Sequence, residues 1–144
     1  MLFRSSDWAS GQHSFESGAI LGWRELEAVA REGASIGSHS VTHPNFGRLD
    51  SQRLPHELSE SREEIRRALG ITVDEFAIPF GQSGNWSEEA MATARDAGYT
   101  VVYAQSEGRR PLGTVARTFI TRFDTPIIFK AALRGRFDEW EEWA

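Results

Sequence analysis

This sequence is most constrained by a regular alternation of amphipathic helices with short apolar strands. In three segments, apolar residues recur at helical spacing and a glycine stands where the helix would end. These segments span residues 23–33, 51–70 and 87–98. A short segment that is typical of a strand follows each helix, at residues 34–37, 74–78 and 99–103. Repeats with such short connections predict parallel β/α units with right-handed crossovers.

The two ends of the chain extend this pattern. We expect further elements in the order strand, polar loop, strand, helix and acidic aromatic segment, at residues 1–6, 7–13, 115–120, 126–133 and 137–143. With 144 residues, 40% of them hydrophobic and 26% charged, the chain has the size and composition of one globular domain. No linker or low-complexity run divides it, so we predict a single domain over residues 1–144.

Composition argues against several classes of function. A net charge of -5 and a pI near 5.4 argue against nucleic acid as a partner, because nucleic-acid-binding surfaces are basic. No apolar run approaches the length of a membrane span and no signal-peptide pattern opens the chain, so we expect a cytoplasmic protein without a membrane span. The sequence has no cysteine, so a bound metal ion would have to rest on His, Asp or Glu.

Two histidines, His39 and His43, stand four residues apart where the strand at 34–37 becomes a loop. Two imidazoles on one short, stiff segment are a common way to bind a divalent transition metal. Pro44 disfavours helical backbone at His43, and Ser40 stands where the helical zinc proteases carry Glu, so we do not expect that helical arrangement. The alternative is a chance H-x-x-x-H spacing in a chain that has four histidines.

Other loops are predicted to meet these histidines. Ligands of parallel β/α arrays bind at the carboxyl ends of the strands. The histidines follow one strand end, Pro79, Phe80 and Gly81 follow another, and Asp7 follows the first strand. The backbone N–H of Phe80, between a rigid and a permissive residue, is a candidate donor to an oxyanion. An ordinary Pro-Gly turn is the alternative interpretation of this segment.

The H-S-x-x-H-P motif of residues 33–44 and the P-F-G turn of residues 76–81 together resemble the polysaccharide deacetylase family, with its NodB homology domain. The resemblance covers most of the chain. It implies an α/β fold of the NodB type, an incomplete irregular (β/α) barrel, and removal of N- or O-acetyl groups from a carbohydrate with a bound divalent metal, most commonly zinc. It also implies that His39 and His43 are metal ligands and that the Phe80 N–H faces the developing oxyanion.

Three further residues are candidates for substrate binding. Pro79 and Gly81 flank the proposed oxyanion donor and are expected to contact the substrate. Trp86 lies in the loop before the helix at 87–98, where it is either a platform for a sugar ring or a residue of the core.

The chain departs from the family pattern at three motifs. The family's first strand carries an Asp-Asp pair that supplies the base and the third metal ligand, and this sequence has no adjacent pair of aspartates. Ala77 stands where the family's R-x-P pattern has Arg, and no histidine follows His56. We therefore expect a domain truncated at its N-terminus, in which Asp7 or His13 completes the metal site.

A barrel without its first strand would leave unpaired backbone at the gap, so we expect a homo-oligomer. The predicted function is a metal-dependent hydrolase that removes acetyl groups from a carbohydrate, acting on C–N bonds other than peptide bonds. The alternative is a catalytically inactive deacetylase-like remnant that serves as a glycan- or metal-binding or structural module. A third interpretation is a generic α/β domain with buried histidines.

Overall fold

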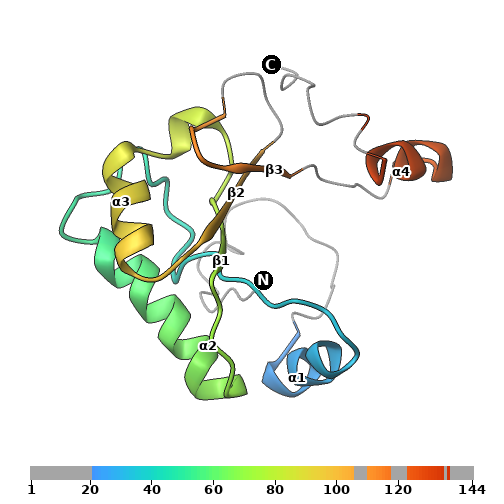
Figure 1. The fold of residues 1–144 in the computed structure, drawn as a ribbon, viewed down its shortest axis with the longest axis horizontal. Helices are drawn as coiled ribbons and strands as arrows, with labels where there is room; N and C mark the ends of the chain where they lie inside the picture. Colours follow the sequence, from blue (N-terminus) through green and yellow to red (C-terminus); the bar gives the residue numbers. More distant parts are fainter. Residues whose placement is uncertain (1–20, 106–109, 118–122, 135, 137–144) are drawn as a thin grey trace.

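The computed structural model describes residues 21–105, 110–117, 123–134 and 136, which include several helices and a small parallel sheet (Figure 1). The described elements are α1 (Trp23–Arg31), the π-helical turn η1 (His56–Glu60), α2 (Ser61–Leu69), β1 (Glu75–Ala77), the 3-10 turn η2 (Ser83–Asn85), α3 (Glu88–Asp96), β2 (Val101–Gln105), β3 (Val115–Arg117) and α4 (Pro126–Ala132). The expectations for residues 1–6, 7–13 and 137–143 lie outside the described residues.

The sheet has the order β1-β2-β3, and both pairs of strands are parallel, as predicted. The expected strand at residues 34–37 is wrong, because only a single bridge forms there, between Ser38 and Phe76. The Ser38 N–H donates to the Glu75 carbonyl at 2.9 Å, and the Ala77 N–H donates to the Ser38 carbonyl at 2.9 Å. The residues before Ser38 are exposed or half-buried and do not extend this ladder.

The helices begin and end where local signals predict. Gly33 and Gly70 follow α1 and α2 with φ angles of 97° and 69°, a left-handed backbone that favours glycine. Ser87 caps α3, with its side chain accepting a hydrogen bond from the Ala90 N–H. The long helix expected from about residue 51 begins instead at Leu54, which places Pro55 in its first turn, where proline is tolerated.

The core lies between the sheet and the two helices α2 and α3, which are on the same side of it (Figure 1). Leu58 of η1 and Phe76 of β1 are both 0% exposed, and Phe76 contacts Phe46 and Trp86 in an aromatic cluster. Burying a side chain of this size contributes about 1.5–3 kcal/mol relative to exposure. This core supports the carboxyl end of β1, beside which the loop of residues 39–43 begins. We call this segment the histidine loop.

Helix α4 differs from the rest, although its position agrees with the predicted helix at 126–133. It lies apart from α2 and α3 (Figure 1) and has no buried residue. Ile127 is 77% exposed and Leu133 is 72% exposed. A closed barrel is not visible in the described residues, so the barrel stays a prediction. Among the same residues, the helices are too short or too polar to cross a lipid bilayer.

Candidate metal and oxyanion site

The site is built on the carboxyl end of β1, where the bridge at Ser38 sets the histidine loop beside the strand. The His39 ring bonds through Nδ1 to the carbonyl oxygen of Ala77, at 2.6 Å. Because a carbonyl oxygen only accepts, Nδ1 is the protonated nitrogen and Nε2 carries the lone pair. Metal-binding histidines in proteins are commonly oriented in this way by a backbone carbonyl.

His39, His43 and Phe80 are in contact. The ring centroids of His39 and His43 are 4.9 Å apart, and those of His43 and Phe80 are 4.6 Å apart. His39 is buried, His43 is half-buried and Phe80 is 53% exposed, so the group runs from the interior to the surface. The structure thus brings together the histidine loop and the P-F-G turn, two segments that sequence order alone separates by more than thirty residues.

Both imidazoles are held in the neutral form at neutral pH. Burial lowers the pKa of His39 from 6.5 to about 4, against the opposing effect of its bond to Ala77. Burial also lowers the pKa of His43, and the positive charge of Arg117 lowers it further. A neutral imidazole is the form that binds a metal ion, so these residues fit such a role without first losing a proton.

Three residues of the site have left-handed backbone that side chains rarely adopt. The φ angles are 73° at Ser40, 56° at His43 and 63° at Phe80. The Ser40 hydroxyl accepts a hydrogen bond from the His43 N–H at 2.9 Å, which stabilises the histidine loop. Such strain persists only where the surrounding structure holds it, and it is frequent at functional sites.

The P-F-G turn is closed by a hydrogen bond from the Gly81 N–H to the Pro79 carbonyl at 2.8 Å. The N–H that closes the turn is therefore that of Gly81 and not that of Phe80. Pro79 is fully buried, and Gly81 is buried with a φ angle of 90°. A side chain at Gly81 would place its Cβ 2.6 Å from Nη2 of Arg117. The turn therefore requires glycine, because of this contact and because of the left-handed backbone.

Trp86 does not present its ring to solvent. It is 7% exposed, and its ring centroid lies 5.1 Å from that of Phe46 and 5.7 Å from that of Phe76. Of the two roles that the sequence left open, the structure favours core packing over sugar stacking for this residue. Asp7 and His13 lie outside the described residues. Within the described part of the chain, no third His, Asp or Glu joins His39 and His43 in a cluster able to hold a metal ion.

Glu57 is a residue of the site that the sequence analysis missed. Its side chain is 0% exposed, and it accepts hydrogen bonds from the N–H groups of Val41 and Thr42 at 3.0 and 2.9 Å. It also accepts a bond from the Thr42 hydroxyl at 2.6 Å. A signal was present in the sequence, because Glu57 falls among the apolar positions of a helical stripe that includes Leu54 and Leu58.

Arg117 is the second residue that was missed. It is the last residue of β3, and its Nη2 donates to the Ile78 carbonyl at 2.8 Å. Its Nε is buried and finds no hydrogen-bond partner among the described residues. Burial lowers the pKa of this guanidinium. Its place at the carboxyl end of a parallel strand was the signal that could have indicated a role in the site.

Comparison with known proteins identifies the family. The sequence profile described as polysaccharide deacetylase matches residues 2–102, which is more than half of the chain. This chain belongs to the polysaccharide deacetylase family. A curated relative, the uncharacterized protein YlxY of Bacillus subtilis (strain 168), is 34% identical over 53 residues, which is 37% of this chain and 17% of that protein.

Solved structures share the fold. The deacetylase PplD of Streptococcus pyogenes, in complex with acetate, superposes with a TM-score of 0.67 at 19% identity, over 81% of this chain and 52% of PplD. BA3943, a CE4 family pseudoenzyme from Bacillus anthracis, superposes with a TM-score of 0.52 at 26% identity, over 60% of this chain and 30% of that one. This chain therefore spans about half the length of PplD, and less of the other two proteins.

Proposed function

We propose that this chain forms part of a metal-dependent carbohydrate deacetylase, a hydrolase that cleaves the C–N bond of an acetamido group. Family membership and the similarity to PplD support this class of activity. The observation that carries the proposal is the contact between His39 and His43 at the carboxyl end of β1, with His39 held by the Ala77 carbonyl. We propose these two histidines as ligands of a divalent ion, with zinc as the metal.

A zinc ion bound there would supply Lewis-acid polarisation of the acetyl carbonyl and a water molecule of lowered pKa. The chain's own residues have three separate tasks. The Ala77 carbonyl accepts a hydrogen bond from the protonated Nδ1 of His39, which leaves the lone pair of the ring on Nε2. The Phe80 N–H is the proposed donor to the developing oxyanion, and the buried residues Pro79 and Gly81 hold the turn that carries it.

Two ligands hold a catalytic metal weakly, because such sites normally have three protein ligands and one open position. We propose Asp7 as the third ligand and His13 as the alternative to it. Zinc affinity measured for Asp7→Asn and His13→Ala distinguishes them, since the residue that binds the metal gives the larger loss. Equal affinity of both variants and the wild type would contradict this part of the proposal.

A second candidate function is an inactive deacetylase-like module that binds a glycan or a metal ion. One observation favours it: the similarity to BA3943, which is described as a pseudoenzyme. A variant of BA3943 is described as having restored enzymatic activity, so in that protein the fold retains the capacity for catalysis.

One experiment separates the two candidates. The melting temperature is measured with and without zinc for the wild type and for His39→Ala, and acetate release from acetylated chito-oligosaccharides is followed in parallel. Zinc stabilisation of the wild type alone, with acetate released, supports the enzyme. The same stabilisation without acetate supports the inactive module. A wild type that zinc does not stabilise contradicts the metal site in both.

We also propose that the chain folds as one domain over residues 1–144 and associates with itself. The reason is that the edge strands of the described sheet can pair through their backbone with a second copy of the chain. Light scattering over a range of concentrations tests this, and a monomer mass at the highest concentration would contradict it.

A further inference from the structure

Glu57 has an environment that few carboxylates occupy. It lies on η1, it is 0% exposed, and its neighbours along the helix include the buried apolar residues Leu54 and Leu58. Moving a carboxylate from water to such a place is strongly unfavourable unless hydrogen bonds replace its hydration. The groups that donate hydrogen bonds to Glu57 therefore indicate which part of the molecule its buried carboxylate stabilises.

Those groups come mainly from the loop between the two histidines. Oε2 accepts the N–H groups of Val41 at 3.0 Å and Thr42 at 2.9 Å, and Oε1 accepts the Thr42 hydroxyl at 2.6 Å. The remaining contact is Arg53, whose Nη2 lies 3.5 Å from Oε1 on a largely exposed side chain. Two successive backbone N–H groups directed at one oxygen form an anion-binding concavity, which here is filled by the protein's own carboxylate.

The loop needs such a contact because its backbone is strained on both sides of the bonded residues. Ser40 precedes them with a φ angle of 73°, and His43 follows them with a φ angle of 56°. Neither residue is glycine, so both conformations are unfavourable in isolation. If the N–H groups of Val41 and Thr42 were released, the loop would relax and the His43 ring would turn relative to the His39 ring.

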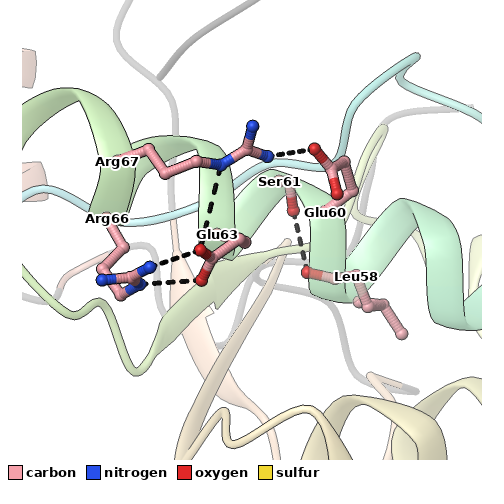
Figure 2. Close-up of polar contacts among 6 residues, drawn as sticks. All are labelled: Leu58, Glu60, Ser61, Glu63, Arg66 and Arg67. Atoms are coloured by element: carbon pink, nitrogen blue, oxygen red, sulfur yellow. Dashed lines mark hydrogen bonds and ion pairs between the residues drawn. The ribbon is translucent and has the colours of Figure 1, made fainter.

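A second contact from the same helix holds the other side of the loop. The hydroxyl oxygens of Ser61 and Ser38 are 2.8 Å apart, and both side chains are buried. Figure 2 shows Ser61 bonded in turn to the Leu58 carbonyl, at 3.0 Å. The helix thus contacts the residue before His39 through Ser61 and the residues before His43 through Glu57. A π-helical turn lies at this point, and π-helical turns are frequent at functional sites.

Two other acidic residues of the helix behave differently. Glu60 and Glu63 have side chains that are 44% and 43% exposed, and they pair with Arg67 and Arg66 on the surface (Figure 2). None of these pairs contacts the histidine loop. Glu60, only three residues from Glu57, therefore provides a matched control: the same residue type, on the same turn, outside the site.

We propose that Glu57 is a positioning residue: its buried carboxylate fixes the backbone of Val41 and Thr42, and thereby the orientation of the His43 ring relative to His39. The proposal rests on the proposed function to the extent that the two rings share a metal ion. It assigns Glu57 no contact with the metal or the substrate.

The test compares Glu57→Met with Glu60→Met and with His39→Ala. Methionine has a volume close to that of glutamate but carries no strong acceptor, so the N–H groups of Val41 and Thr42 and the Thr42 hydroxyl all lose their partner. We expect Glu57→Met to raise the zinc dissociation constant at least about tenfold, as loss of an orienting partner typically does. Glu60→Met should leave the constant unchanged. Thr42→Val, which removes only the hydroxyl bond, should give a smaller increase and serves if Glu57→Met does not fold.

Amide hydrogen exchange, followed by NMR without metal, separates this proposal from the proposed function. We expect faster exchange at Val41 and Thr42 in Glu57→Met and unchanged exchange in His39→Ala. A wild type that binds no zinc overturns the proposed function, while the exchange data still decide the role of Glu57. Unchanged exchange at both amides overturns that role. A lower melting temperature of Glu57→Met with zinc affinity equal to the wild type shows a purely structural residue and overturns it as well.

Discussion

Two regions of the molecule, before and after β3 in the chain, differ sharply in how deeply their apolar side chains are buried. On one side, η1, α2, α3 and β1 share a core in which Leu58, Phe76 and Ala90 are 0% exposed. On the other, α4 has no buried residue, and Phe123 just before it is 79% exposed. Stability depends on buried apolar area, so we expect the free energy of unfolding to come almost entirely from the first region. The histidine loop is hydrogen-bonded to that region, and the stability of the region keeps the strained backbone of the loop in place.

The largest expected effect comes from the core itself. Phe76→Ala should lower the free energy of unfolding by about 3–5 kcal/mol, because it removes a fully buried ring and leaves a cavity. Ile127→Ala in α4 should change it by less than about 0.5 kcal/mol, because that side chain is 77% exposed. Urea unfolding measures both. Comparable losses at the two positions would show that α4 is part of the cooperative core.

The second effect is a pH dependence that belongs to the histidine loop. The unfolded chain takes up a proton at His39 near pH 6.5, whereas the folded chain resists until about pH 4. The free energy of unfolding should therefore fall as the pH decreases through this window, by about 3 kcal/mol from His39 at most. Urea unfolding of the metal-free protein at pH 7.5 and pH 4.5 measures the change. His39→Gln should reduce the pH dependence, and His56→Gln, at an exposed position, should retain it.

A smaller effect tests the P-F-G turn. Gly81→Ala forces a side chain onto a φ angle of 90° and against the Arg117 guanidinium, so we expect a loss of about 1–3 kcal/mol. Gly84→Ala is the matched control, because nothing lies within 4 Å of the Cβ that it would add. Thermal unfolding compares the two, and equal melting temperatures would mean that the turn tolerates a side chain.

The smallest expected change in the free energy of unfolding comes from removing a helix cap, and the two caps compared are those of α3 and α4. Ser87→Ala removes the cap of α3, which packs in the core, and should cost about 1 kcal/mol. Thr125→Ala removes the corresponding cap of α4, where the Ile128 N–H is 3.4 Å from the hydroxyl, and should leave global unfolding nearly unchanged. Chemical denaturation followed by circular dichroism measures both. A larger loss for Thr125→Ala would reverse the ranking of the two regions.

Much of the fold was predictable because its signals are local. Helical spacing, glycines with left-handed backbone and the Ser87 cap act within a few residues, and they located α1, α2, α3 and α4. The strand predicted at 34–37 does not form, because a strand needs a partner to pair with and β1 pairs with this segment only through the bridge at Ser38. Glu57 and Arg117, the two site residues that were not predicted, act on segments fifteen or more residues away.

The sequence by itself determined the parallel β/α order, the family and the histidine pair, because periodicity, turn residues and motif spacing are properties of the chain. Only the tertiary structure decided that the two imidazoles touch, that Trp86 packs inward and that a buried carboxylate holds the loop between the histidines. Burial is the physical reason. Whether a side chain loses its contact with water depends on what packs over it, and that is set by elements distant in the chain.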